Sequence, residues 1–282
     1  MTNWNKDEVA RLLRLGADIA LKYFEAPRLD YKKDASVVTQ ADREIENAFA
    51  ECFDAPEEGS WLFGEETLAG RSEGYIQDAL DGTAWIVDPI DGTASYAHHF
   101  PMWAISIGYA RGGNITEGAV YLPMEGEMLV SEGDAVYHAK GLPASNGPAD
   151  FRIFSLPAAA VDDKLPIALA QRCVRAGGYT GRNVLHSTAS AVFCLAHLML
   201  GHYLAYVADL KLWDLAGALA LLDKLGCASL REDGQPLDTR ITEENYALDP
   251  AAGLGRWRAK GRPVFAASGE AVRYVRSCFQ KP

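Results

Sequence analysis

The chain has 282 residues and is acidic: 27 lysine and arginine residues stand against 38 aspartate and glutamate residues, which gives a formal net charge of -11. This balance excludes a protein that reads a nucleic-acid backbone, because such a protein needs a basic surface, and it opposes binding to anionic membranes. Hydrophobic residues make up 49% of the chain, enough for the core of one large domain or of two close halves. An anionic ligand stays compatible with this charge where metal cations lie between it and the acidic side chains.

The N-terminal segment and the cysteines predict a cytoplasmic protein. The first residues, MTNWNKDEVARLLRLG, are polar and mixed in charge, whereas a signal peptide needs an apolar stretch. The five cysteines are dispersed and form no Cys-x-x-Cys pair, so we expect free thiols in a reducing compartment. The apolar run at 190–208 is interrupted by His197 and by Gly201–His202, and it predicts a buried helix and a buried strand rather than a membrane span.

Hydrophobic periodicity predicts helices and strands throughout the chain. In the first half we expect helices at 7–24 and from Thr39 or Asp42 to 53, strands at 61–64 and 85–87, a polar loop at 69–82, a turn of helix at 94–97 and an antiparallel meander over 103–138. In the second half we expect strands at 151–155, 203–208, 227–230 and 263–267, and helices at 164–175, 187–200, 213–225 and 269–279.

A stretch rich in proline, glycine and serine, GLPASNGPAD at 141–150, predicts a seam between two halves. We therefore expect an N-terminal α+β half at 1–145 and a C-terminal α/β half at 146–282. Because helices alternate with strands in both halves, the predicted fold class is layered α/β (α+β) with mixed and antiparallel sheets.

The tetrapeptide Asp-Gly-Thr-Ala occurs twice, at 81–84 and at 91–94, on either side of the strand predicted at 85–87. Asp81 follows a polar segment, and we expect it to be a loop residue without an acidic companion on an ordered element. Asp91 follows the strand instead, at the edge of an α/β sheet where ligands bind. The second copy is therefore the better candidate for chemistry.

A second acid, Asp88, lies three residues before Asp91, with Pro89 between them. Proline cannot donate a ladder hydrogen bond, so we expect the strand to stop at Pro89 and the chain to turn there. That turn can bring both carboxylates to one side. An ordinary turn without chemistry is an equal alternative on this motif alone, because Asp-Pro and Asp-Gly are common turn formers.

Other acids have the same placement at the ends of predicted elements. Glu65–Glu66 follows the apolar run at 61–64, Asp42 opens a helix, and Asp214 begins the apolar helix at 213–225. For Asp214 alone, a charge that favours the helix dipole is the simpler explanation. Several carboxylates at element ends nevertheless predict an oxygen site for a hard cation.

Four segments, VTQADREIE, FGEET, WIVDPIDGTASY and LWDLAGAL, resemble in this order the signature blocks of the inositol monophosphatase family. The similarity runs from about residue 7 to residue 275. Members of that family are Mg²⁺-dependent, often lithium-sensitive phosphomonoesterases. The resemblance implies the alternating α-β-α-β-α sandwich of the sugar phosphatases, inhibition by Li⁺ and a homodimer.

The resemblance also assigns roles to the acids. Glu65, Asp88 and the Ile90 carbonyl look like the ligands of a first Mg²⁺. Asp88 would bridge to a second ion completed by Asp91 and Asp214, and Glu65 would hold a third ion more loosely. Such ions would clamp and polarise the phosphate and neutralise the leaving oxygen.

The implied catalytic residues are Thr93, Asp42 and Glu65. In the family a water attacks the phosphorus directly, so no covalent phosphoenzyme is expected. Thr93 paired with Asp42 looks like the dyad that orients this water and helps to deprotonate it. The backbone amides of Gly92 and Thr93 would hold the phosphate.

The substrate wall departs from the pattern of family members that act on inositol phosphate. Those read like AYFEGGLKPWD, where this chain has AYVADLKLWD at 205–214, one residue shorter and with Ala208 near the acidic position. Asp209 is the candidate replacement. His186 and Ala189 belong to the segment HSTAS, which stands where GSAA is usual, and complete the candidate substrate residues.

Two segments outside the metal site point to different substrates. KKDASVVTQAD at 32–42 is similar to relatives that act on histidinol phosphate or 3′-phosphoadenosine 5′-phosphate. FPMWAISIGYA and GAVYLP are closer to the inositol phosphatases. The leading expectation is therefore inositol monophosphate. The alternatives are histidinol phosphate, 3′-phosphoadenosine 5′-phosphate, fructose 1,6-bisphosphate, or a non-catalytic metal-binding regulator of the same fold.

Overall fold

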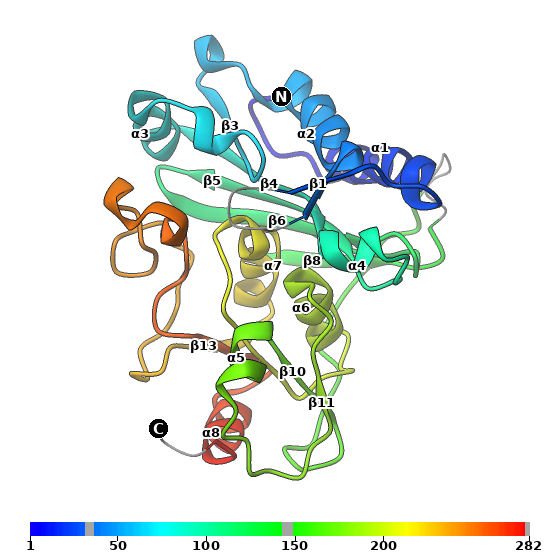
Figure 1. Ribbon diagram of the computed structural model, residues 1–282, viewed down its shortest axis with the longest axis vertical. Coiled ribbons are helices and arrows are strands. Elements are labelled where there is room, and N and C mark those ends of the chain that lie inside the picture. Colours follow the sequence, from blue (N-terminus) through cyan, green and yellow to red (C-terminus); the bar gives the residue numbers. More distant parts are fainter. Residues whose placement is uncertain (32–36, 143–148, 280–282) are drawn as a thin grey trace.

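The computed structural model describes residues 1–31, 37–142 and 149–279 (Figure 1). Most of the seam predicted at 141–150, and the first residues of the segment at 32–42, therefore lie outside the described residues. The division into halves at residue 145 stays a prediction.

A seven-stranded sheet forms the first half of the fold, in the order β3-β4-β5-β6-β7-β8-β9. Only β3 and β4 run parallel; every other neighbouring pair is antiparallel, as the predicted meander requires. The short β9 pairs with β8, so this sheet continues past residue 145. The strands are β3 (Ser60–Gly64), β4 (Thr83–Asp91), β5 (Ala104–Arg111), β6 (Asn114–Leu122), β7 (Glu127–Glu132), β8 (Ala135–Ala139) and β9 (Arg152–Ile153).

Helices cover both faces of this sheet (Figure 1). On one face lie α1 (Lys6–Phe24) and α2 (Gln40–Phe53), and on the other lie α6 (Ala191–Met199) and α7 (Trp213–Lys224). The side chains of β4 alternate between two buried clusters: Trp85 packs with α1 and α2, and Ile86 packs with α6 and α7. This explains why the strand reads as continuously apolar.

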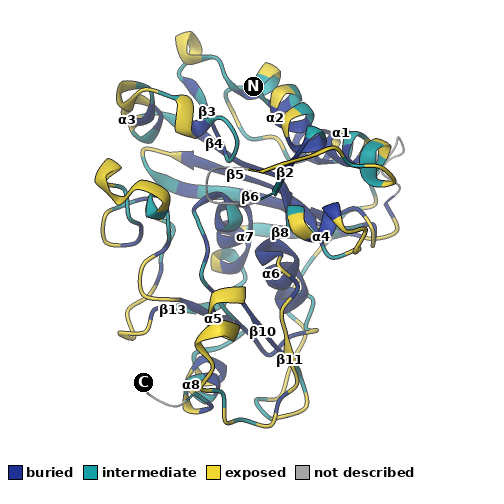
Figure 2. Cartoon of the chain, viewed as in Figure 1, coloured by how far each residue is buried: buried dark blue, intermediate teal, exposed yellow. Residues whose placement is uncertain are grey.

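A second, five-stranded sheet lies beyond α6 and α7, in the order β11-β10-β12-β14-β13. It is mixed: β10 runs parallel to β11 and β12, whereas β14 is antiparallel to β12 and β13. Helices α6 and α7 are buried along most of their length between the two sheets (Figure 2). The elements are β10 (Ile167–Leu169), α5 (Gln171–Ala176), β11 (Leu185–His186), β12 (Ala205–Val207), β13 (Ala228–Leu230), β14 (Val264–Ala266) and α8 (Gly269–Ser277).

The layers alternate as helices, sheet, helices, sheet and helix, because α8 packs on the second sheet. The predicted α/β class with mixed and antiparallel sheets is confirmed. The remaining elements are short: β1 (Leu29–Tyr31), β2 (Val37–Thr39), α3 (Glu73–Asp81), α4 (Thr93–Ala97) and three 3₁₀ turns at Pro56–Glu58, Leu68–Gly70 and Pro250–Gly255. Among the described residues, no helix combines the length and the apolar character needed to cross a membrane.

Two predicted segments are wrong. The loop predicted at 69–82 contains α3, which begins after Ser72, whose hydroxyl caps the helix by accepting from the Tyr75 amide at 3.2 Å. Asp81 is therefore the last residue of a helix. The helix predicted at 164–175 begins as the buried strand β10 and becomes helical only at α5. A short apolar run does not distinguish strand from helix by periodicity alone.

Candidate active site

The carboxyl end of β4 carries Asp88 and Asp91. The strand does not stop at Pro89, as predicted, but continues to Asp91, and its register with β5 shifts between Asp88 and Asp91. The missing N–H of Pro89 is compatible with such an irregularity, because a bulge leaves one residue out of the ladder. Both acids are buried: Asp88 is 1% exposed and Asp91 is 6% exposed.

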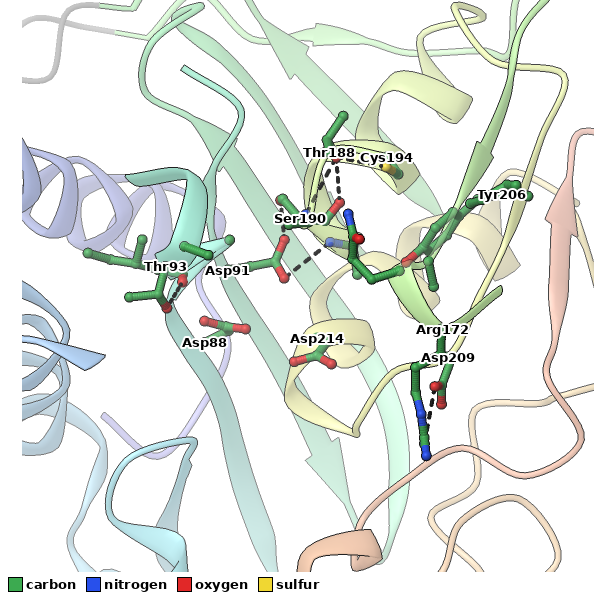
Figure 3. A pocket seen from close by; sticks show the side chains of 18 of the residues that line it. Asp88, Asp91, Thr93, Arg172, Thr188, Ser190, Cys194, Tyr206, Asp209 and Asp214 are labelled. Atoms are coloured by element: carbon green, nitrogen blue, oxygen red, sulfur yellow. Dashed lines mark hydrogen bonds and ion pairs between the residues drawn. The ribbon is translucent and has the colours of Figure 1, made fainter. Parts of the chain in front are cut away.

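Three acids from different elements meet beside this strand end. Glu65 follows β3, Asp88 lies on β4, and Asp214 lies in the first turn of α7; one oxygen of each carboxylate lies within 4.8 Å of the others. Because β3 and β4 are parallel neighbours, their carboxyl ends meet at one edge of the sheet. Asp88 and Asp214 face the same cavity in Figure 3.

Burial and mutual repulsion act together on these carboxylates. Burial raises the pKa of Asp88 well above its usual range, and the charges of Glu65, Asp91 and Asp214 raise it further. The pKa of Asp214 is raised to about 8, mainly by burial and then by Glu65 and Asp91, although the Lys211 amide donates to it at 2.8 Å. Like charges this close favour the neutral forms unless a cation is bound among them.

The donor set fits Mg²⁺. All the candidate ligands are oxygens, which hard divalent cations prefer. Asp88 Oδ1 is buried and has no hydrogen-bond partner among the described residues. An unpartnered carboxylate oxygen is costly in a protein interior, and coordination to a cation would remove that cost.

Asp91 links β4 to α6. Its carboxylate accepts hydrogen bonds from the hydroxyl of Ser190 and from the amides of Ala191 at 3.2 Å and Val192 at 2.7 Å. Burial raises the pKa of Asp91 to about 6, and these hydrogen bonds oppose that rise. The positive end of the α6 dipole thus orients the acid from the opposite layer.

Thr93 and Asp42 lie next to each other, as the predicted dyad requires. The Thr93 hydroxyl is 3.0 Å from the Ile90 carbonyl and 3.4 Å from Asp42 Oδ1. The other oxygen of Asp42 accepts from the Thr39 amide at 2.8 Å and from the Thr39 hydroxyl at 2.5 Å, which closes the capping box of α2. Asp42 is thereby fixed behind Thr93 and is 1% exposed.

Gly92 and Ala189 both line the cavity and both have a positive φ. Gly92 has φ 91, and a Cβ atom there would lie 2.7 Å from Ser190 Cβ, so the position requires glycine. Ala189 also has a positive φ, 61, which is unusual for a residue with a side chain. Gly92 caps α4, and the first two residues of this helix, Thr93 and Ala94, line the cavity.

These groups surround a cavity of about 430 Å³, a volume suited to a small metabolite. One end holds the metal-site acids, Gly92 and Thr93. The other end is formed by Arg172, Asp209 and Arg258. Such an arrangement can bind a cation-bridged phosphate at one end and the remainder of a phosphorylated molecule at the other.

Residues 7–260 match the inositol monophosphatase family. The chain belongs to this family. Inositol-1-monophosphatase of Bacillus subtilis (strain 168) is 29% identical over 247 residues, which cover 84% of this chain and 89% of that protein. The IMPase of Thermotoga maritima has the same fold, with a TM-score of 0.65 and 19% identity over 96% of both chains. SaIMPase-II, solved with inositol monophosphate bound, gives a TM-score of 0.66 at 20% identity and covers 96% of this chain and 92% of its own.

Membership of this family makes the chain a phosphomonoesterase. The acids at the cavity are the side chains that a metal-dependent family requires. All the sequence-predicted metal ligands, Glu65, Asp88, Ile90, Asp91 and Asp214, line one cavity.

Two predicted substrate residues lie differently from expectation. His186 is exposed on β11 and does not line this cavity; its Nδ1 is 3.1 Å from the Tyr203 hydroxyl, and it borders a separate cavity of about 170 Å³. Asp209 lines the catalytic cavity, but Arg172 and Arg258 already pair with its carboxylate. Gly92 and Ala189 line the cavity as predicted.

Three groups at the site have no counterpart in the prediction. Glu46 is 1% exposed and accepts from the amides of Glu66 and Thr67, both at 2.9 Å, so it fixes the loop that carries Glu65. Its place one helical turn after Asp42, on the same face of α2, is a signal that could have revealed it. Arg172 and Arg258 come from distant segments, and no sequence pattern connects them.

Proposed function

We propose that the protein is a Mg²⁺-dependent phosphomonoesterase that hydrolyses a small phosphorylated metabolite by direct attack of water. The observation that carries the proposal is the convergence of Glu65, Asp88 and Asp214 in one cavity with Thr93 and its partner Asp42. Glu65, Asp88, Asp91, Asp214 and the Ile90 carbonyl would hold two to three ions. When bound, Mg²⁺ supplies an activated water and neutralises charge on the phosphate.

The protein's own groups then divide the remaining work. The amides of Gly92 and Thr93, at the start of α4, would hold the phosphate oxygens. The Thr93 hydroxyl would orient the attacking water and pass its proton toward Asp42, 3.4 Å away. Glu65 would assist from the metal side. The hydrogen bonds of Asp91 to the first residues of α6 hold that helix against the end of β4.

The substrate is proposed from the relatives and the cavity together. The names of the relatives make inositol monophosphate the reference substrate. Histidinol phosphate, 3′-phosphoadenosine 5′-phosphate and fructose 1,6-bisphosphate share the same scissile group and are the alternatives. The non-catalytic regulator is disfavoured because each proposed catalytic position holds a group able to do its task. Inhibition by Li⁺, a cytoplasmic location and a homodimer belong to the same proposal.

The direct test is phosphate release from these four compounds with Mg²⁺, repeated with EDTA and with Li⁺. We expect turnover that requires Mg²⁺ and is lost in Asp88→Asn. The variant keeps the size of the side chain but removes a bridging charge. Activity of Asp88→Asn near the wild-type level would overturn the metal assignment. Mg²⁺ binding without hydrolysis of any compound would favour the regulator.

A further inference from the structure

The end of the catalytic cavity away from the metal-site acids is a wall of two arginines and one aspartate, here called the arginine wall: Arg172, Arg258 and Asp209. Arg172 lies on α5, Asp209 follows β12, and Arg258 comes from a loop late in the chain. Asp209 Oδ2 is 3.3 Å from Arg172, and its other oxygen pairs with Arg258. In the view of Figure 3, Asp214 lies between Asp88 and the Arg172–Asp209 pair.

The arginine wall also borders a second cavity, of about 400 Å³. Arg172, Asp209 and Arg258 line both spaces, so a ligand in the catalytic cavity meets these side chains at its outer end. Further along the second cavity, Arg262 lies 3.6 Å from Glu232 and is compensated by it. The excess positive charge is therefore concentrated in the wall itself, where two guanidinium groups share one carboxylate.

The geometry leaves the guanidinium groups available to a ligand. The side chain of Arg172 is 67% exposed and that of Arg258 is 31% exposed, whereas that of Asp209 is only 10% exposed. An ion pair with an arginine as exposed as Arg172 contributes little to folding stability, so stability alone is a weak reason for this second arginine. Asp209 acts instead as a fixed anchor that orients both planar groups toward the cavity.

We propose that the natural substrate carries a second anionic group, a phosphate or a carboxylate, which Arg172 and Arg258 bind while the scissile phosphate lies at the metal-site acids. This inference rests on the proposed function and narrows its substrate class to doubly anionic compounds, against inositol monophosphate. An arginine fork matches the geometry of either oxyanion and can bind it through paired hydrogen bonds. A neutral polyol would meet an acid, Asp209, whose oxygens are already engaged by the two arginines.

Two pairs of compounds isolate the second anion. Fructose 1-phosphate and fructose 1,6-bisphosphate differ by one phosphate, and glycerol 3-phosphate and 3-phosphoglycerate differ by one carboxylate. For the wild type we expect the doubly anionic member of at least one pair to have a KM about 10- to 100-fold lower. The pair that shows the difference identifies the anion as phosphate or carboxylate.

Variants assign the preference to the wall. Arg172→Ala and Arg258→Ala are expected to raise KM for the preferred doubly anionic compound about 10-fold or more, and to affect its singly anionic partner at least 10-fold less. Arg172→Lys should restore part of the affinity, because it keeps the charge but not the fork. Arg182→Ala is the matched control: it removes one arginine whose side chain is 88% exposed and which lines neither cavity.

The results separate this inference from the proposed function. If the singly anionic compounds are hydrolysed as well as their partners, or if the wall variants affect both members equally, the inference is wrong and the phosphatase stands. If the wild type hydrolyses no compound with Mg²⁺, the proposed function fails. Calorimetric binding of fructose 1,6-bisphosphate and 3-phosphoglycerate to the wild type and to Arg172→Ala then decides the inference. Equal affinities for the two proteins would refute it.

Discussion

The two copies of Asp-Gly-Thr-Ala stand at opposite ends of the same strand, β4. Asp81 ends α3 before the strand; it is exposed, and its carboxylate accepts from the Gln77 side chain at 3.0 Å. Asp91 ends the strand; it is buried and accepts three hydrogen bonds from the start of α6. The same residue type therefore lies on the surface in the first copy and in the wall of the cavity in the second.

The glycines and threonines differ in the same way. Gly82 has a negative φ of -103, whereas Gly92 has a positive φ of 91. Thr83 opens β4 and pairs with β5, whereas Thr93 opens α4 and points its hydroxyl at Asp42. The tetrapeptide itself therefore has no fixed function. Its chemistry depends on the carboxyl end of β4, where β3 and α7 bring further acids.

The largest difference is expected for the aspartates. Asp91→Asn should lower kcat/KM about 1,000-fold or more, because a charged metal ligand stabilises the transition state by several kcal/mol. Asp81→Asn should change it less than about 2-fold, since an exposed substitution of this kind is nearly neutral. Phosphate release with saturating Mg²⁺ measures both. Comparable losses in the two variants would mean that the wrong copy has been assigned.

The threonines should differ by somewhat less. Thr93→Val removes the hydroxyl while keeping the shape, and we expect kcat to fall about 100-fold, within the range of positioned proton transfer. Thr83→Val, at the first residue of the strand, should leave kcat nearly unchanged. The pH profile of kcat provides a second readout, because a merely structural role of Thr93 would not alter its shape. An unaltered kcat in Thr93→Val would remove the dyad from the mechanism.

Alanine variants of the two glycines should lose similar amounts of stability but differ in activity. A Cβ at Gly82 would lie 2.4 Å from the Trp61 ring, and one at Gly92 would lie 2.7 Å from Ser190 Cβ with an unfavourable φ in addition. Each alanine variant should lower the free energy of unfolding by about 1–3 kcal/mol. At assay temperatures well below the Tm, where both variants are folded, only Gly92→Ala should also lower kcat. Denaturant titration with parallel assays tests this, and full activity in folded Gly92→Ala would exclude a role for this turn.

The positions of the site acids could be predicted because each lies at one end of an element with a recognisable apolar pattern. Asp88 and Asp91 end an apolar strand, and Asp214 begins an apolar helix, so their neighbours fix their location. Helix α3 was missed because its buried side consists of only Ile76 and Ala79 within a polar segment. Strand β10 was taken for helix because three apolar residues fit either structure.

Of the arginine wall, only Asp209 could be predicted from the sequence. Arg172, Asp209 and Arg258 meet only through the packing of α5 and β12 against a distant loop, and nothing in their local sequence marks that contact. The place of His186 on the edge strand β11, beside a separate cavity, is likewise not evident from its local sequence. Local patterns locate chemistry at element ends, whereas substrate contacts depend on how separate layers come together.

The smallest expected effect concerns stability without metal. The folded-state pKa values, about 8 for Asp214 and about 6 for Asp91, lie above the value of about 3.9 for an unfolded aspartate. Between these values the folded protein binds more protons than the unfolded chain, so these groups make the protein less stable as pH rises. In EDTA, the titration of Asp214 should therefore lower the Tm of the protein by about 2–4 °C between pH 6 and pH 8.

Asp214→Asn isolates that contribution, because the amide does not titrate and the other ionisable groups remain. The difference in Tm between the wild type and this variant, measured in EDTA, should therefore change with pH in the variant's favour as pH rises. With Mg²⁺ the wild type should show the opposite slope, since deprotonated carboxylates bind the cation and binding stabilises the folded state. Asp81→Asn, at the other copy, should produce neither effect. If the difference in Tm between the wild type and Asp214→Asn does not vary with pH, Asp214 is not held among unneutralised charges. That result would argue against a metal site at the second copy more directly than any loss of turnover.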